Sequence, residues 1–74
     1  MPKLPRVSGA EIIRALERLG FVKARQSGSH VVMKRGSTGC VVPLHSEVKV
    51  GTLAGTLRQA GVSGDEFIAA LGRH

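Results

Sequence analysis

The chain has 74 residues, of which 42% are hydrophobic, with 11 Lys or Arg, 5 Asp or Glu and one cysteine. This length predicts one domain over residues 1–74 with a small core. No run of about 18 apolar residues is present, which excludes a membrane span, and the N-terminal residues lack the apolar segment of a secretory signal. The single Cys40 cannot form an internal disulfide, so we expect a cytoplasmic protein.

The formal net charge of +6 comes from the first half of the chain. Residues 1–36 hold eight Lys or Arg and two Glu, whereas residues 37–74 hold three basic and three acidic residues. A one-sided excess of positive charge is typical of proteins that bind a polyanion. We expect a nucleic acid rather than a membrane, because no predicted helix combines a basic face with large exposed apolar anchors. A solvated surface without a partner is the alternative.

Helical signals occur at both ends of the chain. Residues 1–7 are predicted to be a loose lead-in, and Ser8 with Glu11 forms a capping box that predicts a helix from about residue 9 to residue 19. A second helical stripe ends at Gly61, and a second capping box precedes a short last helix. The second stripe consists of Val50, Leu53, Ala54, Leu57 and Ala60, and the second capping box consists of Ser63 and Glu66. Gly51 and Gly55 are predicted to let the second helix approach the sheet closely.

Three strands are predicted between the helices, at residues 21–26, 30–35 and 40–45. We therefore expect an α+β fold in which helices cover one face of a three-stranded antiparallel sheet and leave the other face open. Alternation along the strands predicts which side chains face the helices, namely Val22, Ala24, Val31, Met33, Cys40, Val42 and Leu44. The side chains predicted on the open face are Lys23, Arg25, His30, Lys34, Val41 and His45.

Cationic side chains around an imidazole indicate phosphate chemistry. Lys and Arg can hold a phosphate backbone, and His30 can take a proton near neutral pH from the 2′-hydroxyl that RNA carries. A zinc site formed by Cys40, His45 and His30 is disfavoured, because it lacks a fourth ligand and paired spacing. We expect no metal, cofactor or small-molecule ligand. The terminal His74 is given no role.

In combination, several short motifs resemble the HicA (YcfA-like) toxin family. They are Ser-Gly-x-Glu at residues 8–11, Leu19-Gly20-Phe21, Arg25-Gln26-Ser27-Gly28-Ser29-His30, Val42-Pro43-Leu44-His45, Gly51-Thr52-Leu53, and Gln59-Ala60-Gly61-Val62-Ser63 through to Phe67. The resemblance covers nearly the whole chain. It implies a fold like the double-stranded RNA-binding domain, α-β-β-β-α with a short C-terminal helix, and an mRNA interferase held inactive by an antitoxin of the HicB type.

The resemblance also implies that His30, in the Gly-Ser-His motif, is the catalytic histidine of an endoribonuclease, and it implies no catalytic role for His45. The predicted RNA-binding residues are Lys23, Arg25, Ser29, Lys34, Arg35 and His45. The chain has no Tyr or Trp and only two Phe, so RNA binding is expected to be backbone-directed and weakly sequence-selective. A non-catalytic RNA-binding module of the same fold and an inactive relative that only binds a protein remain alternatives.

Overall fold

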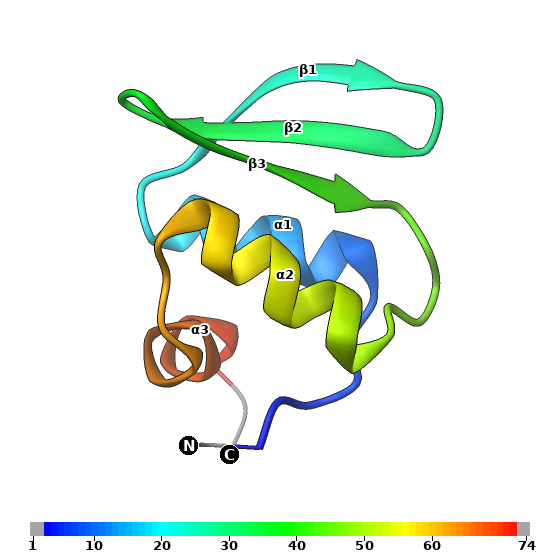
Figure 1. Ribbon diagram of the computed structural model, residues 1–74, viewed down its shortest axis with the longest axis vertical. Helices are drawn as coiled ribbons and strands as arrows, with labels where there is room; N and C mark the ends of the chain where they lie inside the picture. Colours follow the sequence, from blue (N-terminus) through cyan, green and yellow to red (C-terminus); the bar gives the residue numbers. More distant parts are fainter. Residues whose placement is uncertain (1–2, 73–74) are drawn as a thin grey trace.

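The computed structural model describes residues 3–72, so that His74 lies outside the described residues. Figure 1 shows its elements in chain order: α1 (Gly9–Arg18), β1 (Val22–Ser27), β2 (His30–Arg35), β3 (Thr38–Pro43), α2 (Val50–Ala60) and α3 (Gly64–Leu71). This is the α+β order of elements that the sequence predicts, and it matches the double-stranded-RNA-binding-domain type that the family resemblance implies. Within the described part of the chain, no helix is long and apolar enough to cross a membrane.

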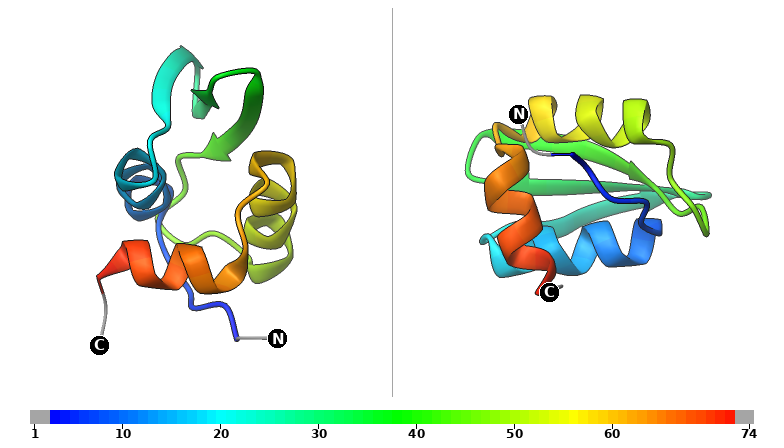
Figure 2. Two further views of the ribbon diagram at one scale, coloured as in Figure 1. Left: turned by 90° about the vertical axis from the view of Figure 1, so that its left-hand side faces the viewer. Right: turned by 90° about the horizontal axis from the view of Figure 1, so that it is seen from below.

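The elements form layers (Figures 1 and 2). The strands lie in the order β1-β2-β3 and are antiparallel, α1 and α2 pack against one face of this sheet, and α3 packs below the two helices. Helix contacts with the sheet are concentrated on β3. The core between the layers includes Ile12, Leu16, Val31, Met33, Val42, Leu53 and Phe67, which are all fully buried. Burial of these apolar side chains is the main force that holds the sheet to the helices.

Both predicted capping boxes are confirmed. The Ser8 hydroxyl accepts from the backbone N–H of Glu11 at 3.1 Å, and the Ser63 hydroxyl accepts from that of Glu66 at 3.1 Å. In each box the Glu carboxylate accepts in return from the Ser backbone N–H, which satisfies two donors that a helix start leaves free. These hydrogen bonds from Ser63 hold the pKa of the Glu66 carboxyl below its usual value.

A bulge in β1 overturns part of the predicted pattern. Lys23 pairs with Met33 and Arg25 pairs with Val32, so Ala24 is an extra residue without a partner. An extra residue shifts alternation by one position, and every residue before it changes face. Val22, predicted to face the helices, is therefore 62% exposed, and the exposure of Ala24 also contradicts its predicted core position.

Three smaller predictions are also wrong, the first of them only at its last residue. Residues 1–7 are predicted to be a loose lead-in, and residues 3–6 hold no helix or strand, but Val7 is buried and pairs with Val48 in an isolated bridge. Residues 1–2 lie outside the described residues. Leu44 lies beyond the end of β3 and is exposed, because the strand covers residues 38–43 instead of 40–45. A Cβ atom at Gly51 would meet no atom within 4 Å, and one at Gly55 would meet only the Arg58 guanidinium. These two glycines therefore do not serve close packing against the sheet.

Candidate nucleic-acid interface and active site

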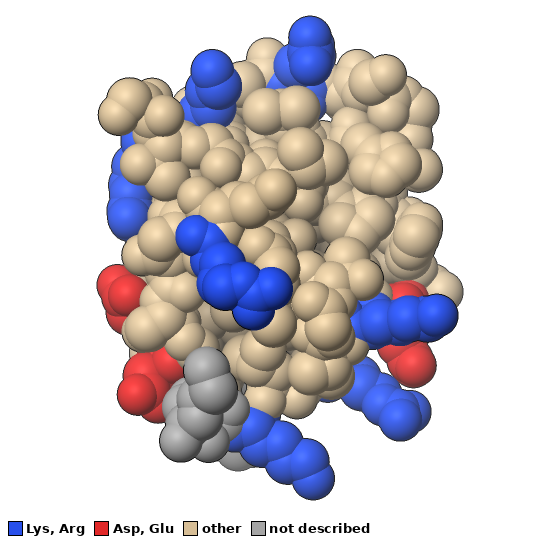
Figure 3. All heavy atoms as spheres, in the orientation of Figure 1, with Lys and Arg blue, Asp and Glu red and all other residues tan. Residues whose placement is uncertain are grey.

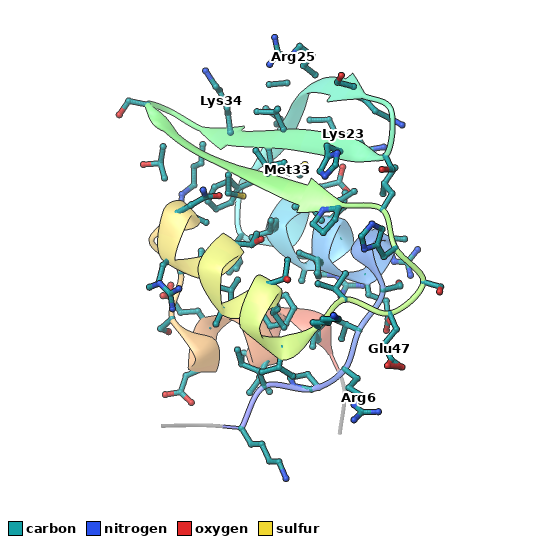
Figure 4. The ribbon with its side chains drawn as sticks, turned by 45° about the vertical axis from the view of Figure 1, so that its right-hand side comes forward. Arg6, Lys23, Arg25, Met33, Lys34 and Glu47 are labelled. Carbon is teal, nitrogen blue, oxygen red and sulfur yellow. The ribbon has the colours of Figure 1, made fainter. Side chains whose placement is uncertain are left out.

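The side of the sheet away from the helices forms a three-by-three grid, which we call the open face. Directly opposed residues share a face, and the register gives the rows Val22–Lys34–Gly39, Arg25–Val32–Val41 and Ser27–His30–Pro43. His30, Arg25 and Lys34 are exposed there, as predicted, and Val41 is 39% exposed. Figure 4 shows Arg25 and Lys34 extending from the sheet on the side away from the helices. One imidazole and two cations thus surround the central Val32.

Charged side chains are distributed unevenly between the sheet and the helices. In the view of Figure 3, the sheet end of the molecule carries Lys and Arg side chains and no carboxylate, whereas the carboxylates lie toward the helical end. The three strands hold Lys and Arg but no Asp or Glu, so a polyanion that approaches the sheet meets positive charge, which favours fast electrostatic association.

Two predicted RNA-binding cations lie elsewhere. Lys23 pairs with Met33, so the bulge places it on the helix side of the sheet and not on the open face as predicted, although it is exposed there. The Arg35 guanidinium donates to the carbonyl of Leu19 at 2.8 Å and stands 4.6 Å from the centre of the Phe21 ring. A hydrogen bond and a cation–π contact therefore tie Arg35 to the connection between α1 and β1.

Next to the open face, a groove runs between the end of β3 and α2. It is lined by His30, Val41, Pro43, His45, Glu47, Val48, Lys49, Thr52, Gly55, Thr56, Arg58 and Gln59. The edge of β3 is closed by α2 here, because the Thr56 hydroxyl donates to the Val41 carbonyl at 3.1 Å and the Gln59 amide oxygen accepts from the Val41 N–H at 3.4 Å. Helix side chains thus satisfy backbone groups that an edge strand otherwise exposes, and the same helix forms a wall beside His30.

The two histidines of the groove are positioned by the backbone around them. His30 is the first residue of β2 and follows a tight turn in which Gly28 has a φ of 57°. Ser29 is exposed in that turn, and its carbonyl accepts from the N–H of Leu44 at 2.6 Å. His45 is exposed, and its carbonyl accepts from the N–H of Gly9 at 2.9 Å. The start of α1 therefore anchors the segment that follows β3.

Cys40 takes no part in this site. It lies on the helix side of β3 in register with Met33, whereas His30 and Pro43 lie on the open face. Burial raises the pKa of the Cys40 thiol, which disfavours the thiolate that metals bind. Within residues 3–72, no group of three or more His, Cys, Asp or Glu side chains is arranged to hold a metal ion.

The α2 wall of the groove was not recognised from the sequence. Thr52, Thr56 and Gln59 recur at helical spacing, three or four residues apart, and such residues share one helix face. That polar stripe is the signal that could have identified the wall. It does not reveal that β3 lies against it, because the packing of a helix beside a strand is a tertiary feature.

Comparison with protein families gives one match. The family model described as the HicA toxin of bacterial toxin–antitoxin systems matches residues 9–62. The matched region begins at the first residue of α1 and includes the whole sheet and α2, and therefore both histidines of the groove. No curated protein matches the chain.

Proposed function

Because the chain belongs to the HicA toxin family of bacterial toxin–antitoxin systems, we propose that it is a metal-independent endoribonuclease that cleaves mRNA with His30 as its catalytic histidine. The observation that supports this proposal best is the position of His30. Its exposed side chain lies both on the open face, with Arg25 and Lys34, and at the groove beside α2. A single-stranded RNA can reach the imidazole there without entering a buried pocket.

In the proposed reaction, His30 acts as the general base. Its imidazole takes the proton of a 2′-hydroxyl, the 2′-oxygen forms a bond to the adjacent phosphorus, and the bond from phosphorus to the 5′-oxygen breaks. The products are a 2′,3′-cyclic phosphate and a chain with a 5′-hydroxyl. Arg25, in the row next to His30, stabilises the negative charge that grows on the phosphoryl oxygens. Lys34 lies in the opposite outer row of the grid and holds a neighbouring phosphate of the RNA.

The RNA-binding residues contribute unequally in this proposal. Arg25 and Lys34 contact phosphates directly, Ser29 and His45 line the approach to His30, and Lys23 adds charge from the other side of β1. Arg35 attracts the RNA mainly through its positive charge at a distance, since its guanidinium is held by Leu19 and Phe21. Contacts to phosphates carry little sequence information, so cleavage is expected at many sequences.

Membership of a toxin–antitoxin family implies an antitoxin partner. We propose a HicB-type antitoxin with an acidic surface that covers the open face, because the same contact would block both RNA binding and His30. Charge complementarity would make the association fast and salt-dependent. Hydrogen exchange of the complex is expected to protect β1 and β2. Protection confined to the helices would contradict this placement.

The decisive experiment compares His30→Ala with the wild-type protein on a long single-stranded RNA. The rate of cleavage is expected to fall by about 10²–10⁴-fold, the usual contribution of acid–base catalysis, while circular dichroism stays native because His30 is exposed. Ser46→Ala is the matched control, since Ser46 is exposed on the loop after β3 and does not line the groove. Undiminished cleavage by folded His30→Ala contradicts the assignment. Tight RNA binding by a wild-type protein that never cleaves would instead support a non-catalytic RNA-binding module.

A further inference from the structure

We propose that His45 is a second catalytic residue, the general acid that protonates the leaving 5′-oxygen. This inference rests on the proposed function. Loss of the 5′-oxygen from phosphorus leaves an alkoxide, which needs a proton to become the 5′-hydroxyl product. Displacement at phosphorus runs in line, so the attacking and leaving oxygens lie on opposite sides of the phosphorus. A base that takes the 2′-hydroxyl proton therefore cannot donate to the 5′-oxygen in the same step, and a separate donor is required.

The strand register brings His45 close to His30. His30 pairs with Pro43, and the hydrogen bond from the Leu44 N–H to the Ser29 carbonyl extends the ladder one residue beyond that pair. His45 therefore lies two residues beyond the strand partner of His30, just past the end of β3. Both side chains line the same groove. A phosphodiester group that enters this groove can therefore meet both imidazoles.

The backbone of His45 is held while its ring is left free. The Gly9 N–H donates to the His45 carbonyl at 2.9 Å, and a Cβ atom at Gly9 would collide with the carbonyl oxygen of Pro43. Only glycine therefore allows α1 to start this close to the end of β3. Within residues 3–72, neither the His30 ring nor the His45 ring takes part in a hydrogen bond or ion pair, so both are available to a substrate.

The other charged groups of the groove are poorly suited to donate this proton. They are Glu47, Lys49 and Arg58. Carboxylates are ordinarily ionised at neutral pH, and lysine and arginine side chains ordinarily keep their protons there. Glu47 also lies 3.8 Å from the Arg6 guanidinium, beside which Figure 4 shows it. An imidazole is the side chain type that exchanges a proton most readily near pH 7, and His45 is the second imidazole that lines the groove with His30.

The test uses two single-stranded oligoribonucleotides that differ in one atom. One contains a normal phosphodiester, and the other contains sulfur in place of the bridging 5′-oxygen at one linkage. A thiolate leaves without protonation, so the sulfur substrate does not need a general acid. For His45→Ala, we expect cleavage of the normal substrate to fall about 10²-fold and cleavage of the sulfur substrate to stay near the wild-type rate. For His30→Ala, cleavage of both substrates is expected to fall.

Ser46→Ala is the matched control and should cleave both substrates at the wild-type rate, and circular dichroism should show that every variant is folded. The pH profile gives a second readout: the wild-type rate should pass through a maximum, and His45→Ala should lose the decline on the alkaline side. Glu47→Gln and Lys49→Gln should retain that decline, because the other titratable groups of the groove would not cause it.

Four results would overturn this role for His45. Wild-type cleavage of the normal substrate by His45→Ala would exclude any role, and an equal loss on both substrates would indicate RNA positioning instead of proton donation. Rescue of His30→Ala by the sulfur substrate would show that the two histidines have the opposite roles. A wild-type protein that cleaves neither oligonucleotide would refute the proposed nuclease itself, and His45 as its acid with it.

Discussion

The two sides of the sheet use the same strands for different purposes. On the helix side, Val31, Met33 and Val42 are fully buried, whereas on the open face Val41 is 39% and Val22 62% exposed. β2 contributes to both sides at alternate positions, so that buried Met33 is followed by exposed Lys34. Stability and ligand binding are therefore separated by one residue step along the chain. Substitutions on the open face should change function at little cost in stability, and substitutions on the helix side should do the reverse.

Among substitutions that test the difference between the two sides of the sheet, Met33→Ala is expected to cause the largest loss of stability. Met33 is fully buried, and removing such a side chain costs about 2–5 kcal/mol of unfolding free energy, which is a large part of what a domain this small has. Val41→Ala is the control on the open face and should cost less than about 1 kcal/mol. Urea unfolding followed by circular dichroism measures both variants. Equal losses would show that the open face also contributes to the core.

Gly9→Ala tests whether the groove depends on the contact between α1 and β3. A Cβ atom there would collide with the Pro43 carbonyl and lie 2.9 Å from the Leu44 Cα, so backbone must move. Overpacking of this kind costs about 1–3 kcal/mol. Because the moved segment carries His45, cleavage by the folded fraction should fall as well. Thermal unfolding and single-turnover cleavage at a temperature where the variant is folded measure the two effects. Unchanged stability would show that the contact relaxes freely.

The parts of this fold that follow local rules were predictable from the sequence. The boxes at Ser8 and Ser63 gave the helix starts, and the alternation of Val31 and Met33 gave the correct face of β2. The bulge at Ala24 was not predictable, because an extra residue in a strand leaves no mark on a short alternating pattern. Val22, Ala24 and Lys23 were therefore assigned to the wrong faces.

The candidate site divides in the same way. The exposure of His30 and Lys34 followed from alternation in β2. The groove could not be predicted in this way, because it forms where α2 packs along the edge of β3. Which element packs beside an edge strand cannot be read from the sequence of either segment alone. The contact of Arg35 with Leu19 and Phe21 also joins residues distant in sequence, so the prediction of Arg35 as an RNA-binding residue could not take it into account.

Removal of the cations of the open face is expected to have a smaller effect, a loss of RNA affinity. Arg25→Ala and Lys34→Ala should each weaken binding of all RNA sequences about equally, since phosphate contacts position the RNA without reading it. Each lost phosphate contact should reduce the slope of log affinity against log salt by about 0.7. Arg14→Ala removes the same charge from an exposed position on α1 and should leave the slope unchanged. Fluorescence anisotropy across a salt series measures all three variants, and a common slope would refute contact through the open face.

The smallest changes are expected from substitutions of the two glycines of α2. Both substitutions should raise stability, but only one of them should lower the rate of cleavage. Gly51 and Gly55 lie in α2 with room for a methyl group, and glycine inside a helix costs roughly 0.5–1 kcal/mol relative to alanine. Gly51→Ala and Gly55→Ala should therefore both raise the melting temperature, by about 4–8 °C per kcal/mol in a domain of this size. Because α2 begins at Val50, the gain should be smaller at Gly51 than at Gly55, where the helix continues on both sides.

Function should distinguish these two variants. Gly55 lines the groove and Gly51 does not, so a new methyl group at Gly55 occupies space that the RNA is proposed to use. We expect Gly51→Ala to cleave RNA at the wild-type rate and Gly55→Ala to cleave several-fold more slowly despite its higher stability. Differential scanning fluorimetry and cleavage kinetics on one RNA measure both properties. Equal, wild-type cleavage by the two stabilised variants would place the RNA on the sheet alone, because the wall of the groove formed by α2 would then be irrelevant to the substrate.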